Sequence, residues 1–481
     1  MPEKAAVTMP NSQEIELMAH LIRRAGFGCN EDQLESYVAK GYDTSVEELL
    51  NPELQEPFPE DLIYRYYPYF KIATALPSQQ SHWVLRMTST NRPLEEKMVL
   101  FWHQIFATGF AKVENAPEMQ RQIEMFRKFG LGKFSDLLVE VSKDPAMIFW
   151  LDNCENHKNA INENYGRELL ELFSMGVGMD GHSNYSEEDV QECARAFTGW
   201  TIAPGLPRYP YGEYMREFQY LGEDHDEGEK TFLGHQGNLD GQDIVNIICQ
   251  QPATARFIAR HMYSFFIADE PPVPSWQNVP PRDLETIELL EREYFRSNYD
   301  IRAMLRVLLH SRGFKETRFS KVKSPVDLVI GIMRLVDNYT QPKPYIHLIS
   351  AACNFMGQEL LNPPTVEGWH TGKEWIDSGA MVERINFAAD QVGDIENPGV
   401  QRIVERLKLY NASYPTESLV EACLNLTGRV PVSQERKNEL ITTFQKGGPV
   451  SFDTPESETD FTKRVTKLLQ LIVSAPEYQL T

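Results

Sequence analysis

The amino-acid sequence predicts a mainly α-helical protein, a multi-helix globular body with a small β-hairpin or loop insertion around residues 205–235. Three observations support this prediction. Helix-capping signals recur along most of the chain, long stretches repeat apolar residues with the helical period, and one stretch is rich in aromatics but poor in helix formers. The composition, 42% apolar and 24% charged, is that of a folded protein. We therefore interpret residues 1–481 as one large helical domain.

Capping residues place the first helices. Ser12 can cap a helix that runs toward Arg24, and Asn30 can cap a second one that ends near Gly41. Ser and Asn side chains accept hydrogen bonds from the free N–H groups of a first helical turn, and glycine favours the residue after the last turn. Later helices are predicted where proline can occupy the first helical position, at Asp144-Pro145, Gln251-Pro252 and Ser324-Pro325.

Three segments interrupt the helical pattern. Residues 205–235 are rich in Tyr and Phe and turn at Asp226-Glu227-Gly228, which is typical of a β-hairpin or an elaborated loop. Residues 270–282 are dense in proline and predict a surface linker. Residues 446–461 predict a flexible loop before the last helix.

The net charge and the motifs exclude several classes of protein. A formal charge of -22 repels phosphate backbones, so nucleic acid is not an expected partner. No apolar run is long enough to predict membrane insertion. The start of the chain lacks the pattern of a signal peptide, so the sequence as it stands predicts a cytoplasmic protein. Six scattered cysteines without a CxxC pair argue against a zinc ribbon or a disulfide framework, and no phosphate-binding loop or GxSxG is present.

Residues 162–176, NENYGRELLELFSMG, predict an amphipathic helix with an unusual polar face. That face contains Asn164, Arg167, Glu168 and Glu171, and the segment has no lysine. A solvated face with weak ion pairs is one interpretation. If another element covers the face, Glu168 and Glu171 can instead present two carboxylates for proton transfer or metal binding, with Arg167 to orient them.

The next helix predicts a capping box and an ionic network. Ser186 and Asp189 match the capping pattern, so Asp189 is expected to bind backbone N–H groups. Glu192 and Arg195 are three residues apart and can pair with each other or reach Arg167 and Glu168. We therefore expect a buried network of Arg and Glu between the two helices, in which removal of one partner costs about 3 to 5 kcal/mol.

Two further groups are candidates. His103 shares a helical face with Glu96, although a lone His among aromatic residues is more often a packed core residue. His225 and Asp226 lie in an acidic turn that can hold a divalent ion or be merely solvated. In segment 360–376, Trp369 and Trp375 either present aromatic platforms to a sugar or another partner, or anchor the loop in the core.

The order of these segments resembles the bacterial family called domain of unknown function 1800. The resemblance rests on segments that span most of the chain, among them HLIRRAGFG at 20–28, PLEEKMVLFWHQIFAT at 93–108, NENYGRELLELFSMGVG at 162–178, YSEEDVQECARAFTGW at 185–200 and PPTVEGWHTGKEWI at 363–376. The resemblance implies no established activity. It does imply a neighbouring gene of a sulfatase-like family, whose product is a candidate partner, and export of many members. Matched hallmark positions include Asn162, Asn164 and Trp200, which we add as candidate substrate or partner residues.

Two functional hypotheses follow. The first is an enzyme, with or without a metal ion. Its candidate catalytic residues are His103, Arg167, Glu168, Glu171, Glu192 and Arg195, and its candidate metal ligands are His103, Glu168, Glu171, His225 and Asp226. The second is a non-catalytic binding or assembly protein, with a glycan or protein partner, in which the polar network is purely structural. The sequence leaves both open, together with the identity of any cofactor.

Overall fold

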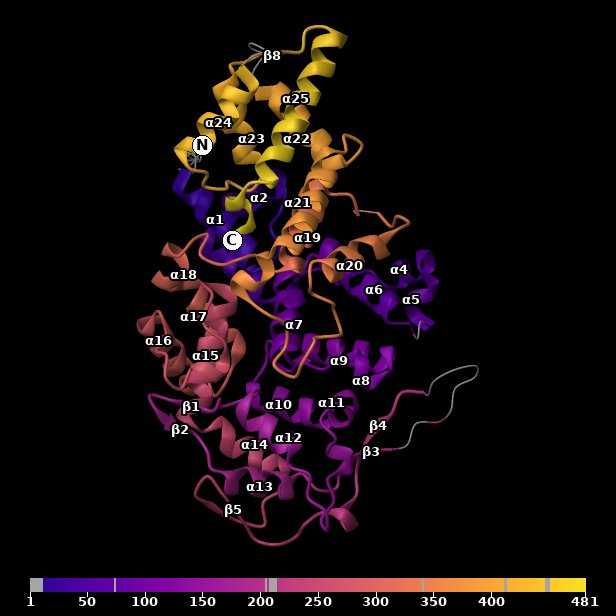
Figure 1. Cartoon of the computed structure of the whole chain (residues 1–481), viewed down its shortest axis with the longest axis vertical. Coiled ribbons are helices and arrows are strands. Elements are labelled where there is room, and N and C mark those ends of the chain that lie inside the picture. Colours follow the sequence, from indigo (N-terminus) through magenta and orange to yellow (C-terminus); the bar gives the residue numbers. More distant parts are fainter. Residues whose placement is uncertain are drawn as a thin grey trace, which may run out of the picture.

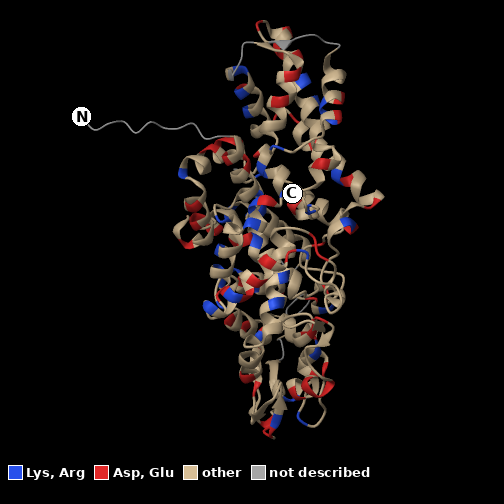
Figure 2. Cartoon of the chain, turned by 90° about the vertical axis from the view of Figure 1, so that its left-hand side faces the viewer, with Lys and Arg blue, Asp and Glu red and all other residues tan. Residues whose placement is uncertain are grey.

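The computed structural model describes residues 12–72, 75–203, 206, 214–339, 341–410, 413–445 and 450–481. The molecule is elongated, with α22–α25 at one end, α10–α14 and short β-hairpins at the other, and α1, α7, α19 and α20 between them (Figure 1). Acidic and basic residues are interspersed along its whole length (Figure 2). The prediction of a mainly α-helical protein is confirmed.

The helices of the first half begin largely where the capping signals predict. The Asn30 side chain accepts a hydrogen bond from the N–H of Gln33 at the start of α2, and Asp144 does the same for Met147 at the start of α11. The helices are α1 (Ser12–Arg24), α2 (Glu31–Lys40), α3 (Tyr42–Leu50), α4 (Glu60–Tyr66), α5 (Pro68–Ile72), α6 (Leu76–Ser89), α7 (Pro93–Ile105), α8 (Phe110–Val113), α9 (Ala116–Phe129), α10 (Phe134–Lys143), α11 (Pro145–Trp150), α12 (Asn164–Glu171) and α13 (Glu187–Ala196).

The second half continues the pattern. Ser324 and Asp327 form a capping box at the start of α19, with Pro325 at its first position. The helices are α14 (Gly241–Cys249), α15 (Pro252–Phe266), α16 (Leu284–Arg296), α17 (Ile301–His310), α18 (Arg312–Glu316), α19 (Pro325–Val336), α20 (Ile346–Phe355), α21 (Ser378–Gly393), α22 (Pro398–Tyr410), α23 (Thr416–Leu426), α24 (Gln434–Gln445) and α25 (Pro455–Val473).

Short antiparallel two-stranded pairs and a few isolated bridges are the β structure in the described ranges. The pairs are β1 (Gly178–Met179) with β2 (His182–Ser183), β3 (Trp200–Ala203) with β4 (Glu217–Tyr220), β5 (Lys230–Phe232) with β6 (His235–Gly237), and β7 (Ser413–Tyr414) with β8 (Val450–Ser451). The predicted insertion around 205–235 thus contains β4 and β5 and extends beyond its predicted limits. Residues 226–228 do not form a hairpin turn, because the Asp226 side chain accepts the N–H of Gly228 and the strand begins only at Lys230.

The other two irregular segments differ in part from their predictions. Residues 270–282 pack against α15 through Trp276 and Glu270, which are 8% and 7% exposed, so the segment is held more firmly than a surface linker. In the predicted loop at 446–461, residues 446–449 lie outside the described residues, and α25 already begins at Pro455, where Thr454 caps it.

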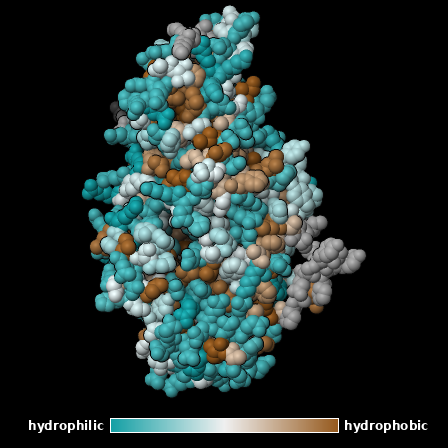
Figure 3. All heavy atoms as spheres, in the orientation of Figure 1, coloured by the Kyte–Doolittle hydropathy of each residue, from teal (hydrophilic) through white to brown (hydrophobic). Residues whose placement is uncertain are grey.

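The core contains large aromatic residues and a few fully desolvated ion pairs. Trp83 and Trp102 are completely buried, and Trp83 donates its indole N–H to Glu96, which also binds the guanidinium groups of Arg86 and Arg127. The visible face in Figure 3 is mainly hydrophilic with scattered apolar patches. No helix within the described ranges is both long and apolar enough to cross a bilayer.

Candidate functional site

The helix α12, where the candidate carboxylates lie, is held close to α13. A Cβ atom on Gly166 would lie 3.1 Å from the backbone nitrogen of Ala194, so this contact suits glycine. Asn162 and Asn164 fix the chain before the helix. The side-chain oxygen of Asn162 accepts the backbone N–H of Asn164 at 3.0 Å, and the side-chain amide of Asn164 donates to the backbone carbonyl of Leu151 at 3.1 Å. Both side-chain amides therefore hold the backbone in place before α12.

Arg167 makes an exposed link between α12 and α13. Its guanidinium binds Glu187 at 2.8 Å and Glu163 at 3.3 Å, and the Glu187 side chain is 74% exposed. We expected a buried network in which Arg167 and Glu168 meet Glu192 and Arg195. That expectation is wrong, because Arg167 pairs on the solvent side of the two helices and Arg195 turns toward another segment. Such an exposed pair contributes at most about 1 kcal/mol.

Arg195 and Glu192 hold the turn at 225–229 and β5. The guanidinium of Arg195 binds Glu192 at 2.8 Å and Asp226 at 2.8 Å, each side chain being about one fifth exposed. Glu192 also accepts the N–H of Thr231 at 3.0 Å. The Ser186 and Asp189 capping box is confirmed. These contacts fasten one segment to α13 and consume the hydrogen-bonding capacity of the charged groups.

His103 is a completely buried residue of α7. Its ring lies edge-on to Trp83 and Trp369, with centroids 5.7 and 5.1 Å away. Neither ring nitrogen has a hydrogen-bond partner among the described residues, and the expected neighbour Glu96 binds Arg86 and Arg127 instead. Burial lowers the pKa of His103 to about 3, so the ring is neutral at physiological pH.

The candidate metal ligands do not form one centre. Within the described ranges, no group of three or more His, Cys, Asp or Glu side chains could hold a metal ion. His225 is 7% exposed and its Nδ1 lies 2.9 Å from the carbonyl oxygen of Thr198, while Asp226 is paired with Arg195. The predicted ligands therefore do not come together in one site, because each segment turns its polar groups toward a different neighbour. They are His103, Glu168, Glu171, His225 and Asp226.

The three candidate tryptophans are core residues. Trp200, Trp369 and Trp375 are only 5 to 6% exposed. Trp200 packs against Phe197 and Phe218, with centroid distances of 5.1 and 5.5 Å. These rings are therefore not exposed stacking platforms, and of the two alternatives for the 360–376 loop, the core anchor is the one observed.

Glu168 and Glu171 are the two carboxylates of α12 that form no ion pair with an arginine of the described residues. Glu171 accepts a hydrogen bond from the hydroxyl of Tyr185 at 3.4 Å. Glu168 is half-buried and makes no side-chain hydrogen bond or ion pair in the part of the chain that the structure describes. Burial, together with the charges of Glu171 and Glu367, raises the pKa of Glu168 to about 7, and Arg167 opposes that shift.

A large hollow comes close to this pair through Leu172 and Glu367. It is a cleft of about 860 Å³ between α15, the 270–282 segment and the 364–374 loop, and both Leu172 and Glu367 line it. Leu172 follows Glu168 by four residues, one helical turn. The charged side chains on the cleft wall are Asp269, Glu270, Glu367, Glu374, Arg282 and Lys373. Carboxylates are thus in excess, which disfavours polyanionic ligands.

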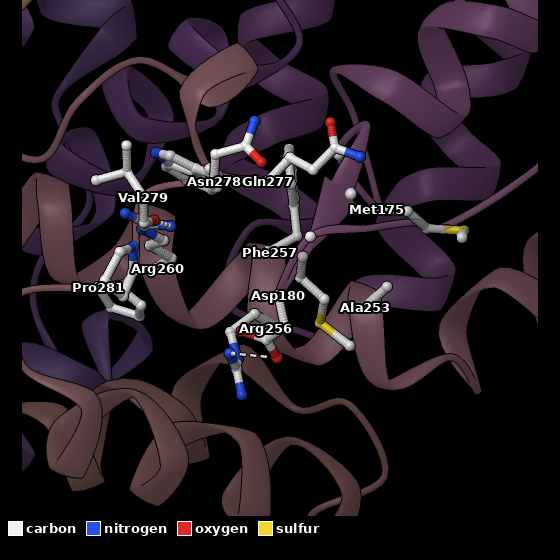
Figure 4. Close-up of a pocket in the computed structure, with 16 residues that line it drawn as sticks. Met175, Asp180, Ala253, Arg256, Phe257, Arg260, Gln277, Asn278, Val279 and Pro281 are labelled. Atoms are coloured by element: carbon white, nitrogen blue, oxygen red, sulfur yellow. Dashed lines mark hydrogen bonds and ion pairs between the residues drawn. The ribbon is translucent and has the colours of Figure 1, made fainter.

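A smaller hollow of about 210 Å³ also borders the 270–282 segment and shares Trp276, Val279 and Pro280 with the cleft (Figure 4). Its two arginines project from α15, and both have acidic partners. Arg256 binds Glu291 and approaches Asp180 at 3.8 Å, whereas Arg260 binds Glu270 at 2.7 Å. Because these charges are already matched, this hollow offers no free cation to a ligand.

Sequence reasoning missed two residues of the Glu168 environment. Tyr185 directly precedes the Ser186 cap and reaches back to Glu171, and Glu367 arrives from a loop about 200 residues further along the chain. Nothing in the local pattern places Glu367 near α12. The segment around Tyr185 predicts only the helix cap at Ser186 and Asp189, not a contact with Glu171.

The fold and this site define a class: a mainly α-helical protein with short β-hairpins and a carboxylate pair at the edge of a large cleft. The chain belongs to the family described as Protein of unknown function (DUF1800), whose model matches residues 20–480. No curated protein and no solved structure matches it.

Proposed function

We propose that the protein is an enzyme in which Glu168 transfers a proton to or from a substrate held in the 860 Å³ cleft. The observation that carries this proposal is the environment of Glu168, a half-buried carboxyl group without a side-chain partner in the described ranges. It is close enough to Glu171 and Glu367 to feel their charges, and Leu172, one turn further along, and Glu367 line the cleft. A general acid or base works best when its pKa lies near the working pH. The pKa of about 7 supports that role.

The neighbours of Glu168 suit different tasks. Glu171, which Tyr185 binds, lies one turn along the helix and favours the protonated form of Glu168 by its charge. Glu367 lies across from α12 on the cleft wall and has the same effect. A carboxyl group that can donate a proton, placed close to other carboxyl groups, serves hydrolysis or isomerisation. The excess of carboxylates on the wall favours a neutral or cationic substrate.

Two measurements test the proposal. In the first, chromogenic glycosides, esters and amides without negative charge are screened, and Glu168→Gln is compared with the wild type. We expect a fall in kcat of about 10²-fold or more, the usual effect of removing a general acid or base. Glu163→Gln, on the same helix but paired with Arg167, serves as the matched control and retains activity.

The second measurement does not require a known substrate. Carboxyl ¹³C resonances of glutamate-labelled protein are titrated, and the resonance missing from Glu168→Gln is assigned to Glu168. A titration near pH 7 supports the proposal. A midpoint near the ordinary pKa of 4.5, or a loss of activity of less than threefold in the variant, rejects it.

The alternative, a non-catalytic assembly protein, has one observation in its favour. Exposed apolar side chains gather on α4, α5 and α20; α4 packs on α5, and α5 and α20 both pack on α6. They are Leu62, Tyr66, Tyr69, Tyr345, Leu348 and Phe355. A protein partner, such as the product of the neighbouring sulfatase-like gene, would bind there. Tyr66→Ser with Leu348→Ser would then abolish co-purification of the two proteins while turnover, if present, is unchanged.

A further inference from the structure

Three buried cations and the partly exposed Arg23 meet where α1, α19, α21 and the 476–481 segment come together. Figure 1 shows α1 and α19 close to the C-terminal end of the chain, and the Lys323 ammonium group donates to the Tyr478 carbonyl across that junction. The four cations are Arg23, Arg24, Lys323 and Arg384. None of them forms an ion pair with a carboxylate of the described residues.

Arg24 and Arg384 form the deep part of this group, and both are 0% exposed. Arg24 donates to the carbonyl oxygens of Phe265 and Phe266, and Arg384 donates to the side-chain oxygen of Gln479 at 2.8 Å and to the carbonyl of Lys323 at 2.7 Å. In each guanidinium group Nη1 has no partner in the described part of the chain. Two buried charged donors are therefore incompletely satisfied.

Lys323 and Arg23 form the shallow part. Lys323 is 9% exposed; its ammonium group donates to the Tyr478 carbonyl at 2.7 Å and lies 3.7 Å from the centre of the Tyr478 ring. Arg23 donates to the Gly428 carbonyl at 2.8 Å and lies over the Phe319 ring, and its Nε is buried without a partner among the described residues. Carbonyl dipoles and aromatic faces stabilise a cation, but they do not neutralise it.

The nearby carboxylates are bound to other cations. Asp327 pairs with Lys97, Asp269 with Lys321 at 2.9 Å, and Glu31 with Arg429. Although burial alone would raise it, the charges of Lys97, Arg24 and Lys321 lower the pKa of Asp327 to about 2. Burial, together with the charges of Arg23 and Arg384, lowers the pKa of Lys323 well below its ordinary value. Positive charge therefore exceeds negative charge inside this junction.

A cavity opens at the shallow cations. The charged side chains that line it are Arg23, Lys323, Glu31 and Asp327, and its apolar wall includes Leu34, Leu335, Leu426 and Val430. Its free volume of about 70 Å³ accommodates a small ion. Holding three buried cations and the partly exposed Arg23 together without carboxylate partners is costly unless an anion joins them.

We propose that this cavity binds a small oxyanion, such as phosphate or a short carboxylate, through Lys323 and Arg23, with Arg24 and Arg384 supplying positive charge from the layer behind. The apolar wall favours an anion with a few carbon atoms over a highly charged polyanion. This site is distinct from Glu168 and does not depend on the proposed activity. Phe319, which lines both this cavity and the large cleft, is the residue between them.

Thermal unfolding tests the proposal directly. The intact protein is unfolded in chloride and in phosphate, acetate or hexanoate, all at one ionic strength, and binding is confirmed by ³¹P line broadening or calorimetry. At an anion concentration ten times Kd, the folded-to-unfolded ratio rises about elevenfold. Phosphate and hexanoate arms show which oxyanion is preferred. If none of these anions raises Tm above the chloride control, the proposal is wrong.

Variants then locate the site. Lys323→Met is expected to abolish the anion-dependent rise in Tm and to raise Tm slightly in chloride, because it removes an unmatched buried charge. Lys373→Met, an exposed lysine on the wall of the large cleft, leaves the anion response unchanged. An equal anion response in Lys323→Met and the wild type rejects the assignment. If Lys323→Met does not fold, Arg23→Gln at the cavity wall is judged by the same criterion.

Discussion

Trp369 lies edge-on to His103, with their ring centroids 5.1 Å apart and their planes at 75°. The indole N–H and both imidazole nitrogens are buried and have no hydrogen-bond partner in the described ranges. Ring packing alone therefore joins the 364–374 loop to α7 at this point. The loop also forms one wall of the cleft, so the shape of the cleft depends on this contact.

The first prediction concerns His103 and acid stability. Its pKa is about 3 in the folded protein and about 6.5 when unfolded, so the unfolded state binds more protons between these values. Stability contributed by the neutral ring above pH 6.5 is lost as the pH falls toward 3. Between pH 7 and pH 4.5, the free energy of unfolding of His103→Met, measured in urea, is expected to fall by about 2 to 3 kcal/mol less than that of the wild type. The exposed His370→Met is the control, and an equal acid sensitivity in both variants contradicts the prediction.

The second prediction concerns Glu168 and has the opposite sign. Because its folded pKa of about 7 lies above the unfolded value of 4.5, the carboxyl group favours folding while protonated, and this contribution is lost as the pH rises from 4.5 to 7. After allowance for its partial exposure, Glu168→Gln should be about 1 kcal/mol more stable than the wild type at pH 8 and equal to it at pH 4. Glu163→Gln should show no such trend. A loss of stability at pH 8 would favour the purely structural interpretation of α12.

The third prediction concerns the anchor of β4. Glu118 is completely buried and binds Arg216 through both carboxylate oxygens, whereas the next pair, Arg121 with Glu217, lies at the surface. Glu118→Ala is expected to cost about 3 to 5 kcal/mol, because it leaves the buried Arg216 charge unpaired. Glu217→Ala should cost less than about 1 kcal/mol. Chemical denaturation of both variants measures the difference, and similar costs would show that Arg216 finds another partner or solvent.

The fourth prediction separates architecture from catalysis at Arg195. Arg195→Ala and Asp226→Asn should each cost about 1 to 2 kcal/mol, and their double mutant should cost less than the sum because the two side chains share one interaction. Hydrogen exchange at residues 225–232 should increase in each variant. Substrate turnover, once measured, should be retained. A large loss of turnover without faster exchange would return Arg195 to the set of catalytic candidates.

Local signals in the sequence were sufficient for much of the helical frame. Asn30, Asp144 and Ser324 start helices as predicted, since capping involves hydrogen bonds within three residues of the cap. The same locality explains the confirmed capping box at Ser186. At 226–228, where the sequence left a hairpin and a loop open, the structure shows a loop, which Asp226 turns through the N–H of Gly228 and which Arg195 holds from another element.

For the candidate site, residue type and spacing identified the polar face of α12. They could not show which of its charged side chains are exposed to solvent and which are paired with residues of other segments. Arg167 turns to Glu187 and Arg195 to Asp226, which leaves Glu168 without either arginine as a hydrogen-bonding partner. The approach of Glu367 and the burial of Arg24 and Arg384 bring together residues that lie about 200 to 360 positions apart. Helix starts follow from short-range hydrogen bonds, which the sequence displays. Charge balance and pKa depend on desolvation and long-range packing, which arise only when distant segments enclose the same space.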